Sequence, residues 1–388
     1  MKQIYADNAA TTKMSKKAVA AMLPFLEENY GNPSSLHTAG QIAKKAITNA
    51  RGEIANCLGA KMSEIVFTSG GSEADNQAIM TGAEYGRQNG KMHIISQKTE
   101  HHAVLHTLKK LEQQGFEITL LDVDAFGMVT AEQVKNAIRE DTALVTIMMA
   151  NNEIGTIMPI KDIGKVCREK GVLFHTDAVQ AVGHIPINVR NIGCDMLSFS
   201  AHKFHGAKGV GALYIKSKLT PYCLIEGGEQ ESGRRAGTEN VAGIVAMAAA
   251  LQESVENMKE KSKKITEIRN RIIGGLWEIN NSVLNGSKAR RLPNNISFCF
   301  KGIQGEALLL LLDTYGICVS SGSACTSGSL EPSHVLTAIG RKEDMIYGSL
   351  RISISEETTI EDADYIIDSV QECVEKLRKM SPTLKNKD

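Results

Sequence analysis

The sequence predicts an α/β protein built on a mostly parallel sheet, with a second and smaller α/β domain. Three observations predict this fold class. Strand-like and helical segments alternate from about residue 63 to residue 215. The strand-like segments are almost continuously apolar, as parallel strands are when helices cover both faces of their sheet. The chain has 388 residues, and at about 100–200 residues per domain this length favours two domains.

Seven short apolar runs are the expected strands of the sheet: Glu64–Thr68, Met92–Ser96, Phe116–Asp122, Ala143–Ala150, Val172–Thr176, Met196–Ser200 and Gly209–Ile215. Segments with the 3.6-residue period of a helix lie between several of them: Ser72–Arg87, Ala131–Arg139 and Ile160–Lys170. Ligands of such sheets bind at the carboxyl ends of the strands. We therefore expect the functional residues at those ends.

The second domain is predicted from the C-terminal third of the chain. The charge-rich stretch Glu253–Arg271 is typical of one long, solvated helix, and new strand patterns come after it at Asn295–Phe300 and Leu350–Ser355. We expect residues 15–254 to form the large domain. Residues 1–14 and 255–388 would form the small one.

Composition excludes several classes of protein. Lys and Arg total 44, as do Asp and Glu, so no charge excess favours a nucleic acid or an anionic membrane as a partner. The longest apolar stretch, Val241–Leu251, is roughly half of what a bilayer span needs. Asp7 interrupts the N-terminus before an apolar region forms, so we expect no secretory signal and a cytoplasmic protein.

The eight cysteines form no Cys-x-x-Cys pair, and their spacing favours neither a zinc site nor a disulfide scaffold. We expect no intrinsic metal. Cys325 differs from the others because it lies among Ser, Gly, Ala and Thr residues. That composition predicts a mobile polar loop in which a thiolate can reach a substrate. The alternative is an exposed thiol with no function.

Two charged residues come at the ends of expected strands. Lys203 comes just after Met196–Ser200, where desolvation in a cleft would make its amine nucleophilic; the alternative is a solvated loop lysine. Asp177 ends the preceding strand, and a buried acid there needs a cation such as a pyridinium nitrogen. Its alternative role is an N-cap of the next helix.

The run Ser69-Gly70-Gly71-Ser72 joins a strand to a helix, and amides exposed at a helix N-terminus suit a phosphate. An ordinary helix cap is the alternative. The run lacks the Gly-Lys-Ser/Thr ending of a P-loop, which disfavours nucleotide binding.

Taken together and in order, these motifs resemble the cysteine desulfurases of the NifS/IscS type, which depend on pyridoxal 5'-phosphate (PLP) and belong to the class-V aminotransferases, in the subgroup with the long Cys loop. The resemblance extends over nearly the whole chain. It rests on Asp7-Asn8-Ala9-Ala10-Thr11-Thr12, Gly31-Asn32-Pro33-Ser34-Ser35, Thr99-Glu100-His101-His102, Asn151-Asn152-Glu153-Ile154-Gly155, Ser200-Ala201-His202-Lys203, Gly233-Arg234-Arg235-Ala236-Gly237-Thr238, Ser320-Ser321-Gly322-Ser323-Ala324-Cys325 and Leu350-Arg351-Ile352-Ser353.

The resemblance implies the PLP-dependent transferase fold type I and a set of site residues. Lys203 would carry PLP covalently, His101 would stack on its ring and move protons, Asp177 would pair with the ring nitrogen, and Gln180 with the phenolic oxygen. The phosphate would be held by Gly71, Ser72, Ser200, His202 and, from a second subunit, Thr238. Asn152 would contact cofactor and substrate, and Arg351 would bind the substrate carboxylate with two hydrogen bonds.

The implied reaction converts L-cysteine to L-alanine and leaves a persulfide on Cys325. The implied partners are a second copy of the chain and a sulfur acceptor, either an iron–sulfur scaffold protein of the NifU/IscU type or a tRNA-thiolating enzyme. Cys325 would also be able to ligate a transferred iron–sulfur cluster. Three alternatives stay open: a selenocysteine lyase, which does not need Cys325, an aminotransferase of the same fold, and a non-catalytic scaffold. Four further histidines are expected to be scattered structural or surface residues: His93, His106, His175 and His334.

Overall fold

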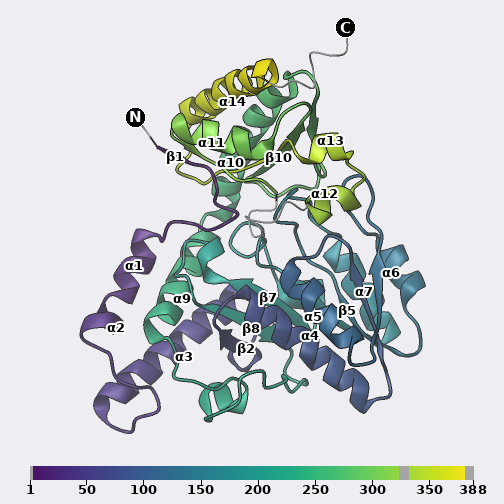
Figure 1. Cartoon of the computed structure of the whole chain (residues 1–388). Coiled ribbons are helices and arrows are strands. Elements are labelled where there is room, and N and C mark those ends of the chain that lie inside the picture. The colour runs from purple at the N-terminus through teal and green to yellow at the C-terminus, as the bar shows by residue number, and fades with distance from the viewer. Residues whose placement is uncertain (1–2, 323–331, 381–388) are drawn as a thin grey trace.

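Seven strands form one sheet in the larger of two bodies (Figure 1). This computed structural model describes residues 3–322 and 332–380. The sheet order is β2-β8-β7-β6-β5-β3-β4. The strand β8 runs opposite to the other six strands of this sheet, so the predicted fold class, a mostly parallel seven-stranded sheet, is confirmed. The strands are β2 (Ile65–Thr68), β3 (His93–Gln97), β4 (Glu117–Leu121), β5 (Thr142–Thr146), β6 (Leu173–Asp177), β7 (Met196–Ser200) and β8 (Gly211–Ile215).

Alternate residues of these strands enter two different hydrophobic cores. On β2, Ile65 and Phe67 join the core under one set of helices, whereas Val66 joins the core on the opposite face. The period of two in a strand produces this division. One core is covered mainly by α3 (Thr38–Leu58), α6 (Ala131–Ala137), α7 (Ile160–Lys170), α8 (Val189–Ile192) and α9 (Val241–Val255), and the other by α4 (Gly71–Gln88) and α5 (His102–Glu112).

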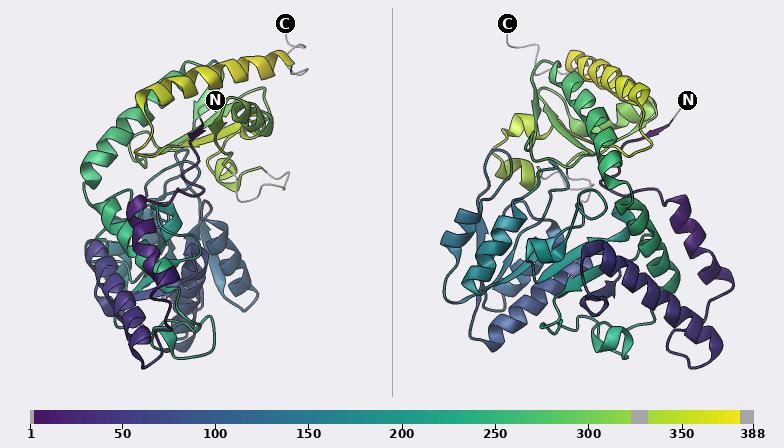
Figure 2. Two further views of the ribbon diagram at one scale, coloured as in Figure 1. Left: turned by 90° about the vertical axis from the view of Figure 1, so that its left-hand side faces the viewer. Right: turned by 180° about the vertical axis from the view of Figure 1, so that it is seen from behind.

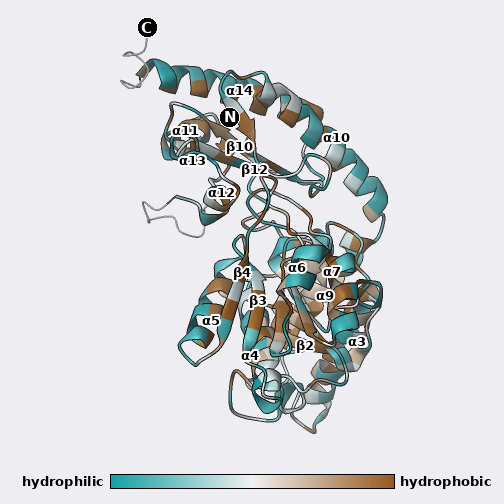
Figure 3. Ribbon diagram, turned by 90° about the vertical axis from the view of Figure 1, so that its right-hand side faces the viewer, coloured by the Kyte–Doolittle hydropathy of each residue, from teal (hydrophilic) through white to brown (hydrophobic). Residues whose placement is uncertain are grey.

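The smaller body has its own core around a three-stranded antiparallel sheet of order β12-β10-β9. Figure 2 shows α10 and α14 running along one side of this body. In Figure 3, β10 is mainly hydrophobic, whereas α14 alternates between hydrophilic residues and the hydrophobic ones that join this core. The elements are β9 (Ser282–Leu284), β10 (Asn295–Phe300), β12 (Ser349–Ser353), α10 (Met258–Trp277), α11 (Gly305–Thr314), α12 (His334–Ala338), α13 (Glu343–Ile346) and α14 (Ile360–Met380).

The N-terminal segment connects the two bodies. Its strand β1 (Ile4–Tyr5) pairs in parallel with β11 (Ile317–Cys318), and Ile4 belongs to the core of the smaller body. The next helices, α1 (Lys16–Met22) and α2 (Pro24–Glu27), contact α9 of the larger body. The segment between β1 and α1 therefore crosses from one body to the other. The division of the chain at residues 14/15 and 254/255 stays a prediction.

The expectation of one solvated helix over Glu253–Arg271 is wrong. The helix α9 ends at Val255, and α10 starts at Met258 after Asn257 adopts a left-handed conformation with a φ of 58°. Neither Gly nor Pro marks this break, but Asn tolerates the left-handed region better than most residues. The stretch is also not fully solvated, because Ile265, Ile268 and Arg269 are buried. No helix in the described ranges is long and apolar enough to cross a bilayer.

Candidate active site

A cavity of about 310 Å³ lies at the carboxyl ends of β6 and β7. Ten of the residues predicted from the sequence line it: Gly71, Ser72, His101, Asn152, Asp177, Gln180, Ser200, His202, Lys203 and Arg351. Thr238 is exposed and does not line the cavity, and its expected contact from a second subunit stays a prediction. Cys325 lies outside the residues that the structure describes.

Lys203 projects its amine into this cavity from a short turn, Ala201–Lys203, that follows the buried strand β7. Its Nζ donates hydrogen bonds to the carbonyl oxygens of Ala9, at 2.6 Å, and Ala10, at 2.8 Å. Both acceptors come from the segment that crosses between the two bodies. Because they are uncharged peptide oxygens, they orient the amine without contributing a counter-charge.

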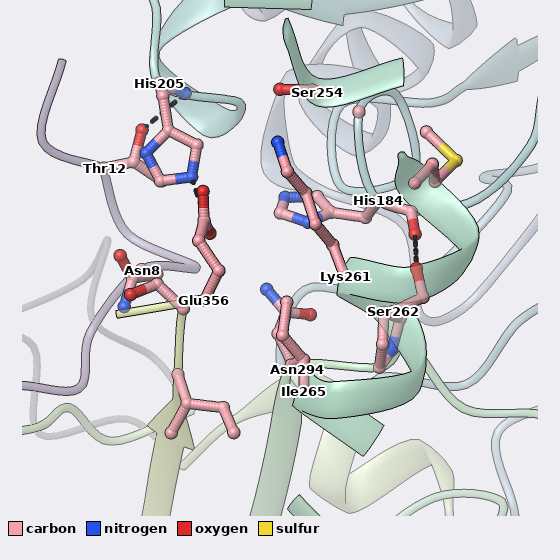
Figure 4. Close-up of a pocket in the computed structure, with 15 residues that line it drawn as sticks. Asn8, Thr12, His184, His205, Ser254, Lys261, Ser262, Ile265, Asn294 and Glu356 are labelled. Atoms are coloured by element: carbon pink, nitrogen blue, oxygen red, sulfur yellow. Dashed lines mark hydrogen bonds and ion pairs between the residues drawn. The ribbon is translucent and has the colours of Figure 1, made fainter. Parts of the chain in front are cut away.

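Residues that line a second, smaller cavity of about 30 Å³ hold the backbone beside Lys203 (Figure 4). His184 lines this cavity, and its Nε2 donates to the carbonyl oxygen of Lys203 at 2.9 Å. His205 lines it too and lies 3.4 Å from Glu356, while its backbone N–H donates to Thr12 at 2.8 Å. Burial opposes a charge on His205, but Glu356 outweighs burial and raises the pKa of that imidazole.

Asp177 and Asp75 form a pair of carboxyl groups in the larger cavity, and both are almost completely buried. Asp177 Oδ1 accepts a hydrogen bond from the Val179 N–H at 2.8 Å. Burial raises the pKa of Asp177, whereas the nearby Lys203 ammonium opposes that rise. For Asp75, burial and then the neighbouring Asp177 raise the pKa well above its usual range. Asp75 Oδ1 has no hydrogen-bond partner among the described residues. Two such carboxyl groups suit a ligand with a cationic ring nitrogen.

The other end of the site suits an anion. The eighteen-residue helix α4 begins at Gly71, and its N-terminus meets Ser200 and His202 around an opening that continues toward Lys208. The first amides of a helix are unpaired donors with a partial positive charge, which favour a phosphate. A Cβ at Gly71 would come within 2.6 Å of Val179 Cγ2, so a glycine is needed for the close approach of helix and strand end.

His101 caps the N-terminus of α5. Its Nδ1 accepts a hydrogen bond from the Ala103 N–H at 3.1 Å, so in the neutral ring Nε2 carries the hydrogen. Burial first, then the nearby Lys203 and three neighbouring histidines, together lower the pKa of His101 to about 4. These neighbours are His102, His106 and His334, and the ring of His102 lies 5.1 Å from that of His106 and 4.7 Å from that of His334. The expectation that His106 and His334 are scattered residues therefore missed their proximity to His102.

Arg351 extends from β12 of the smaller body into the cavity, with only 3% of its side chain exposed. Its Nη2 donates to Asp7 at 3.0 Å and its Nη1 to the carbonyl oxygen of Asn152 at 3.3 Å. The Nε donor has no partner in the described part of the chain. An unused donor on a buried guanidinium suits a ligand carboxylate.

Two polar residues predicted to contact the cofactor, Gln180 and His202, also bond to the N-terminal segment. Gln180 Nε2 donates to the carbonyl oxygen of Ala9 at 2.9 Å, and His202 Nδ1 lies 3.2 Å from Thr11 Oγ1. The sequence analysis missed four residues of the site. It quoted Asp7 and Ala9 in a motif without predicting a role for either, and no motif pointed to Asp75 or His184. Within residues 3–322 and 332–380, no group of three or more His, Cys, Asp or Glu residues is placed to hold a metal ion.

The chain is similar to proteins of one family. Residues 4–366 match the family "Aminotransferase class-V". A protein of Methanosarcina thermophila named "Cysteine desulfurase IscS" is 52% identical over 381 residues, which cover 98% of this chain and 94% of the relative. Among solved structures, a "NIFS-LIKE PROTEIN" has a TM-score of 0.91 at 39% identity and covers 97% of this chain and 100% of its own. The structure "SspA in complex with cysteine" has a TM-score of 0.80 at 38% identity and covers 92% and 100%.

Proposed function

The chain belongs to the class-V aminotransferase family, and from this membership and the geometry of the cavity we propose that it is a PLP-dependent cysteine desulfurase. The proposal depends most on one observation: Lys203, Asp177 and Arg351 line the same cavity. The relative and the two solved structures carry names that include cysteine desulfurase, NifS-like protein and a complex with cysteine, which support the same activity.

The cavity fits the cofactor at both ends. Lys203 would hold PLP covalently, Asp177 would pair with its ring nitrogen and Gln180 with its phenolic oxygen. The phosphate would be held by Gly71, Ser72, Ser200, His202 and a second subunit's Thr238. Bound PLP would supply an electron sink for charge that develops at the substrate Cα.

The substrate would be held by its carboxylate, for which Arg351 offers its unused Nε donor beside Asn152. The Lys203 amine lines the same cavity and would serve as the base that removes the Cα proton. His101 is a neutral imidazole at neutral pH and carries its hydrogen on Nε2, from which it would donate a hydrogen bond to the ligand in the cavity.

The sulfur would then move to Cys325. Its thiolate would attack the substrate sulfur, so that an S–S bond forms as the C–S bond breaks, and protonation of the remainder gives alanine. The balanced reaction is L-cysteine plus the Cys325 thiol giving L-alanine plus the Cys325 persulfide. We further propose a homodimer in the cytoplasm whose persulfide is delivered to an iron–sulfur scaffold or a tRNA-thiolating enzyme.

The first experiment compares wild type with Cys325→Ala, measuring alanine and sulfide released from L-cysteine in the presence of a reductant. Matched amounts from wild type and neither from the variant would support desulfuration through Cys325. Equal release by both proteins would contradict the role of Cys325 and favour the selenocysteine lyase. If neither protein releases alanine, the chain acts on another substrate, as an aminotransferase of this fold would.

A further inference from the structure

Both ring nitrogens of His205 face groups that can only accept a hydrogen bond. Its Nδ1 lies 3.0 Å from the carbonyl oxygen of Lys13, and its Nε2 lies 3.4 Å from a carboxylate oxygen of Glu356, which Figure 4 shows facing the ring. A neutral imidazole carries one N–H and could satisfy only one of these acceptors, whereas an imidazolium satisfies both. The geometry therefore fits a positively charged His205 that is paired with Glu356.

The other charged groups around this ring do not cancel the pair. Burial opposes a charge on His205, but Glu356 and the carbonyl oxygen of Lys13 outweigh burial and the opposing charge of Lys261, so the pKa of His205 is raised. His184 lines the same cavity, and burial lowers its pKa, so it stays neutral. His205 also borders a wider opening in which neither sign of charge is in excess, lined by Lys13, Lys16, Lys208, Glu253, Glu357 and Asp362.

The backbone of His205 adopts a conformation that its neighbours must hold in place. Its φ is 67°, in the left-handed region that a residue with a Cβ enters at a cost of roughly 1 kcal/mol. Such conformations persist where the surrounding contacts fix them. Asparagine enters this region more readily than most residues, so it offers a substitution that preserves the local backbone.

Those contacts come from the crossing segment, residues 6–15 between β1 and α1. The N–H of His205 donates to Thr12 Oγ1 at 2.8 Å, and its carbonyl oxygen accepts from the Ser15 N–H at 3.0 Å. Thr12 donates from both its N–H and its hydroxyl to the carbonyl oxygen of His202, each at 2.9 Å. The chain before and after Lys203 is therefore fixed to the same segment whose carbonyl oxygens hold the Lys203 amine.

Glu356 brings the smaller body into this arrangement. It lies between β12 and α14, and its carboxylate reaches the His205 ring from there. We propose that His205 and Glu356 are positioning residues for Lys203: their ion pair clamps the turn after β7 and the crossing segment to the smaller body, and so keeps the amine directed into the cavity. This inference rests on the proposed function, because Lys203 is the residue proposed to hold PLP.

The first test uses the protein without cofactor. His205→Asn preserves the left-handed backbone and Glu356→Gln preserves the shape of its side chain, but each removes the ion pair. We expect each to speed hydrogen–deuterium exchange of the Thr12 and Ser15 amides about threefold or more, measured in peptides that cover residues 11–16, because these amides bond to the turn. Exchange in the buried strand β3 should not change. Unchanged exchange in residues 11–16 would overturn the clamp.

A matched control is available shortly after the same segment. Lys17 in α1 pairs with Glu256 at 3.5 Å, a similar distance, but this pair does not involve the turn after β7. Lys17→Gln should leave the exchange of Thr12 and Ser15 as in wild type. Equal acceleration by Lys17→Gln would show that loss of any nearby ion pair loosens the segment, and would overturn the specific role of His205.

The second test follows Lys203 itself. When PLP is added to the apoprotein, the Lys203 amine condenses with the PLP aldehyde and one water leaves, so the rise of visible absorbance gives the rate of the link. At pH 6 we expect His205→Asn and Glu356→Gln to slow this rate about tenfold, a moderate cost of misplaced reacting groups, and Lys17→Gln to leave it unchanged.

The pH separates the charge of the pair from its shape. As pH rises through the raised pKa of His205, wild type loses the imidazolium and with it the attraction to Glu356. The ratio of the wild-type rate to that of Glu356→Gln should therefore shrink toward 1 at alkaline pH. A ratio that stays constant from pH 6 to pH 10 would mean that Glu356 acts only through its shape, and would overturn the inference.

A double-substitution cycle tests whether the two residues act as one pair. In the Glu356→Gln background, His205→Asn should slow the link no further, since the pair is already lost. Costs that multiply would overturn the inference. A wild type that forms no covalent link with PLP would overturn the proposed function and the inference together. Equal rates of linking in wild type and both variants would overturn the inference alone.

Discussion

The carboxylate of Asp7 lies 3.0 Å from Nη2 of Arg351, and this pair joins the N-terminal segment to β12 across 344 positions of the sequence. The same two segments also pair through their backbones, where Asp7 bridges to Ser353. The guanidinium that we propose for the substrate carboxylate is thus oriented by an acid before any substrate binds.

Substitution of Asp7 should weaken substrate binding. Asp7→Asn keeps the shape of the side chain but removes a charge-assisted hydrogen bond, leaving Arg351 free to change its orientation. We expect KM for L-cysteine to rise about 3- to 10-fold, with a smaller change in kcat, which corresponds to about 1 kcal/mol of binding free energy. Steady-state kinetics measure this. A fall in KM would mean that Asp7 competes with the substrate instead of orienting Arg351.

Substitution of Lys203 should remove both the cofactor link and the base. Lys203→Ala should lose the visible absorbance of covalently bound PLP and lower turnover by about 10²–10⁴-fold or more. Lys216 is a suitable control, because it also comes directly after a strand of the same sheet but is exposed and pairs with Asp195. Lys216→Ala should keep colour and activity. An active, coloured Lys203 variant would contradict the role assigned to this residue.

The start of α4 should tolerate no side chain at residue 71. Gly71→Ala places a Cβ 2.6 Å from Val179 Cγ2, which must shift the cradle we propose for the phosphate. We expect the apoprotein to bind PLP about tenfold more weakly or worse, by about 1.4 kcal/mol, in a fluorescence titration. Gly274, inside α10, has nothing within 4 Å of its Cβ position. Gly274→Ala should leave PLP binding unchanged and stabilise the fold by up to about 1 kcal/mol.

Glu100 should make stability depend on pH. Burial raises the pKa of Glu100 to about 8. Between its usual pKa and that value, the folded protein holds a proton that the unfolded chain has released, so stability falls as pH rises, by up to about 1.4 kcal/mol per pH unit. Gln imitates the protonated acid, and Glu100→Gln should therefore gain stability relative to wild type from pH 5 to pH 8. Denaturant unfolding at several pH values measures the difference. For the exposed control Glu306→Gln, the plot of unfolding free energy against pH should run parallel to that of wild type. A parallel plot for Glu100→Gln would contradict the raised pKa of Glu100.

His101 should act as a neutral group throughout the working range. Its pKa of about 4, set mainly by burial, leaves the imidazole unprotonated from pH 6 to pH 8. His101→Gln should lower kcat about 10²–10⁴-fold, the usual contribution of a proton-transferring side chain, by the same factor at each pH. His106→Gln, on the exposed side of α5, is the matched control and should stay within about twofold. A ratio of wild type to variant that changes near pH 6.5 would show that His101 titrates there.

Much of the fold was predictable because the spacing of apolar residues along a segment indicates which of its faces is buried. The helix Ile160–Lys170 and the strand Met196–Ser200 have the bounds that the sequence predicts. Lys203 and Asp177 are found from the same pattern, because the carboxyl ends of neighbouring parallel strands meet at one edge of the sheet.

The contacts between distant segments were not predictable in this way. Asp75 lies within α4, and the helical period alone does not show that an acid there is buried beside Asp177. The hydrogen bonds from Arg351 to Asp7, at 3.0 Å, and from Ser333 Oγ to Glu153 Oε2, at 2.6 Å, depend on how the two bodies meet, which cannot be deduced from spacing in the sequence. The break between α9 and α10 at Asn257 was missed because the surrounding charge-rich sequence contains no local signal for a left-handed residue.

The crossing of the N-terminal segment between the two bodies also sets an order of events during synthesis. Ala9 and Ala10, whose carbonyl oxygens receive the Lys203 amine, come shortly after β1. The partner of β1 is β11, at residues 317–318, and Asn8 and Ala9 bond to Ser353 on β12. A growing chain has all seven strands of the large sheet by residue 215, yet it cannot dock its own first residues until more than a hundred further residues have left the ribosome. The two hydrogen bonds that orient the amine of Lys203 therefore form among the last steps of folding, and the pocket around this amine is completed only then.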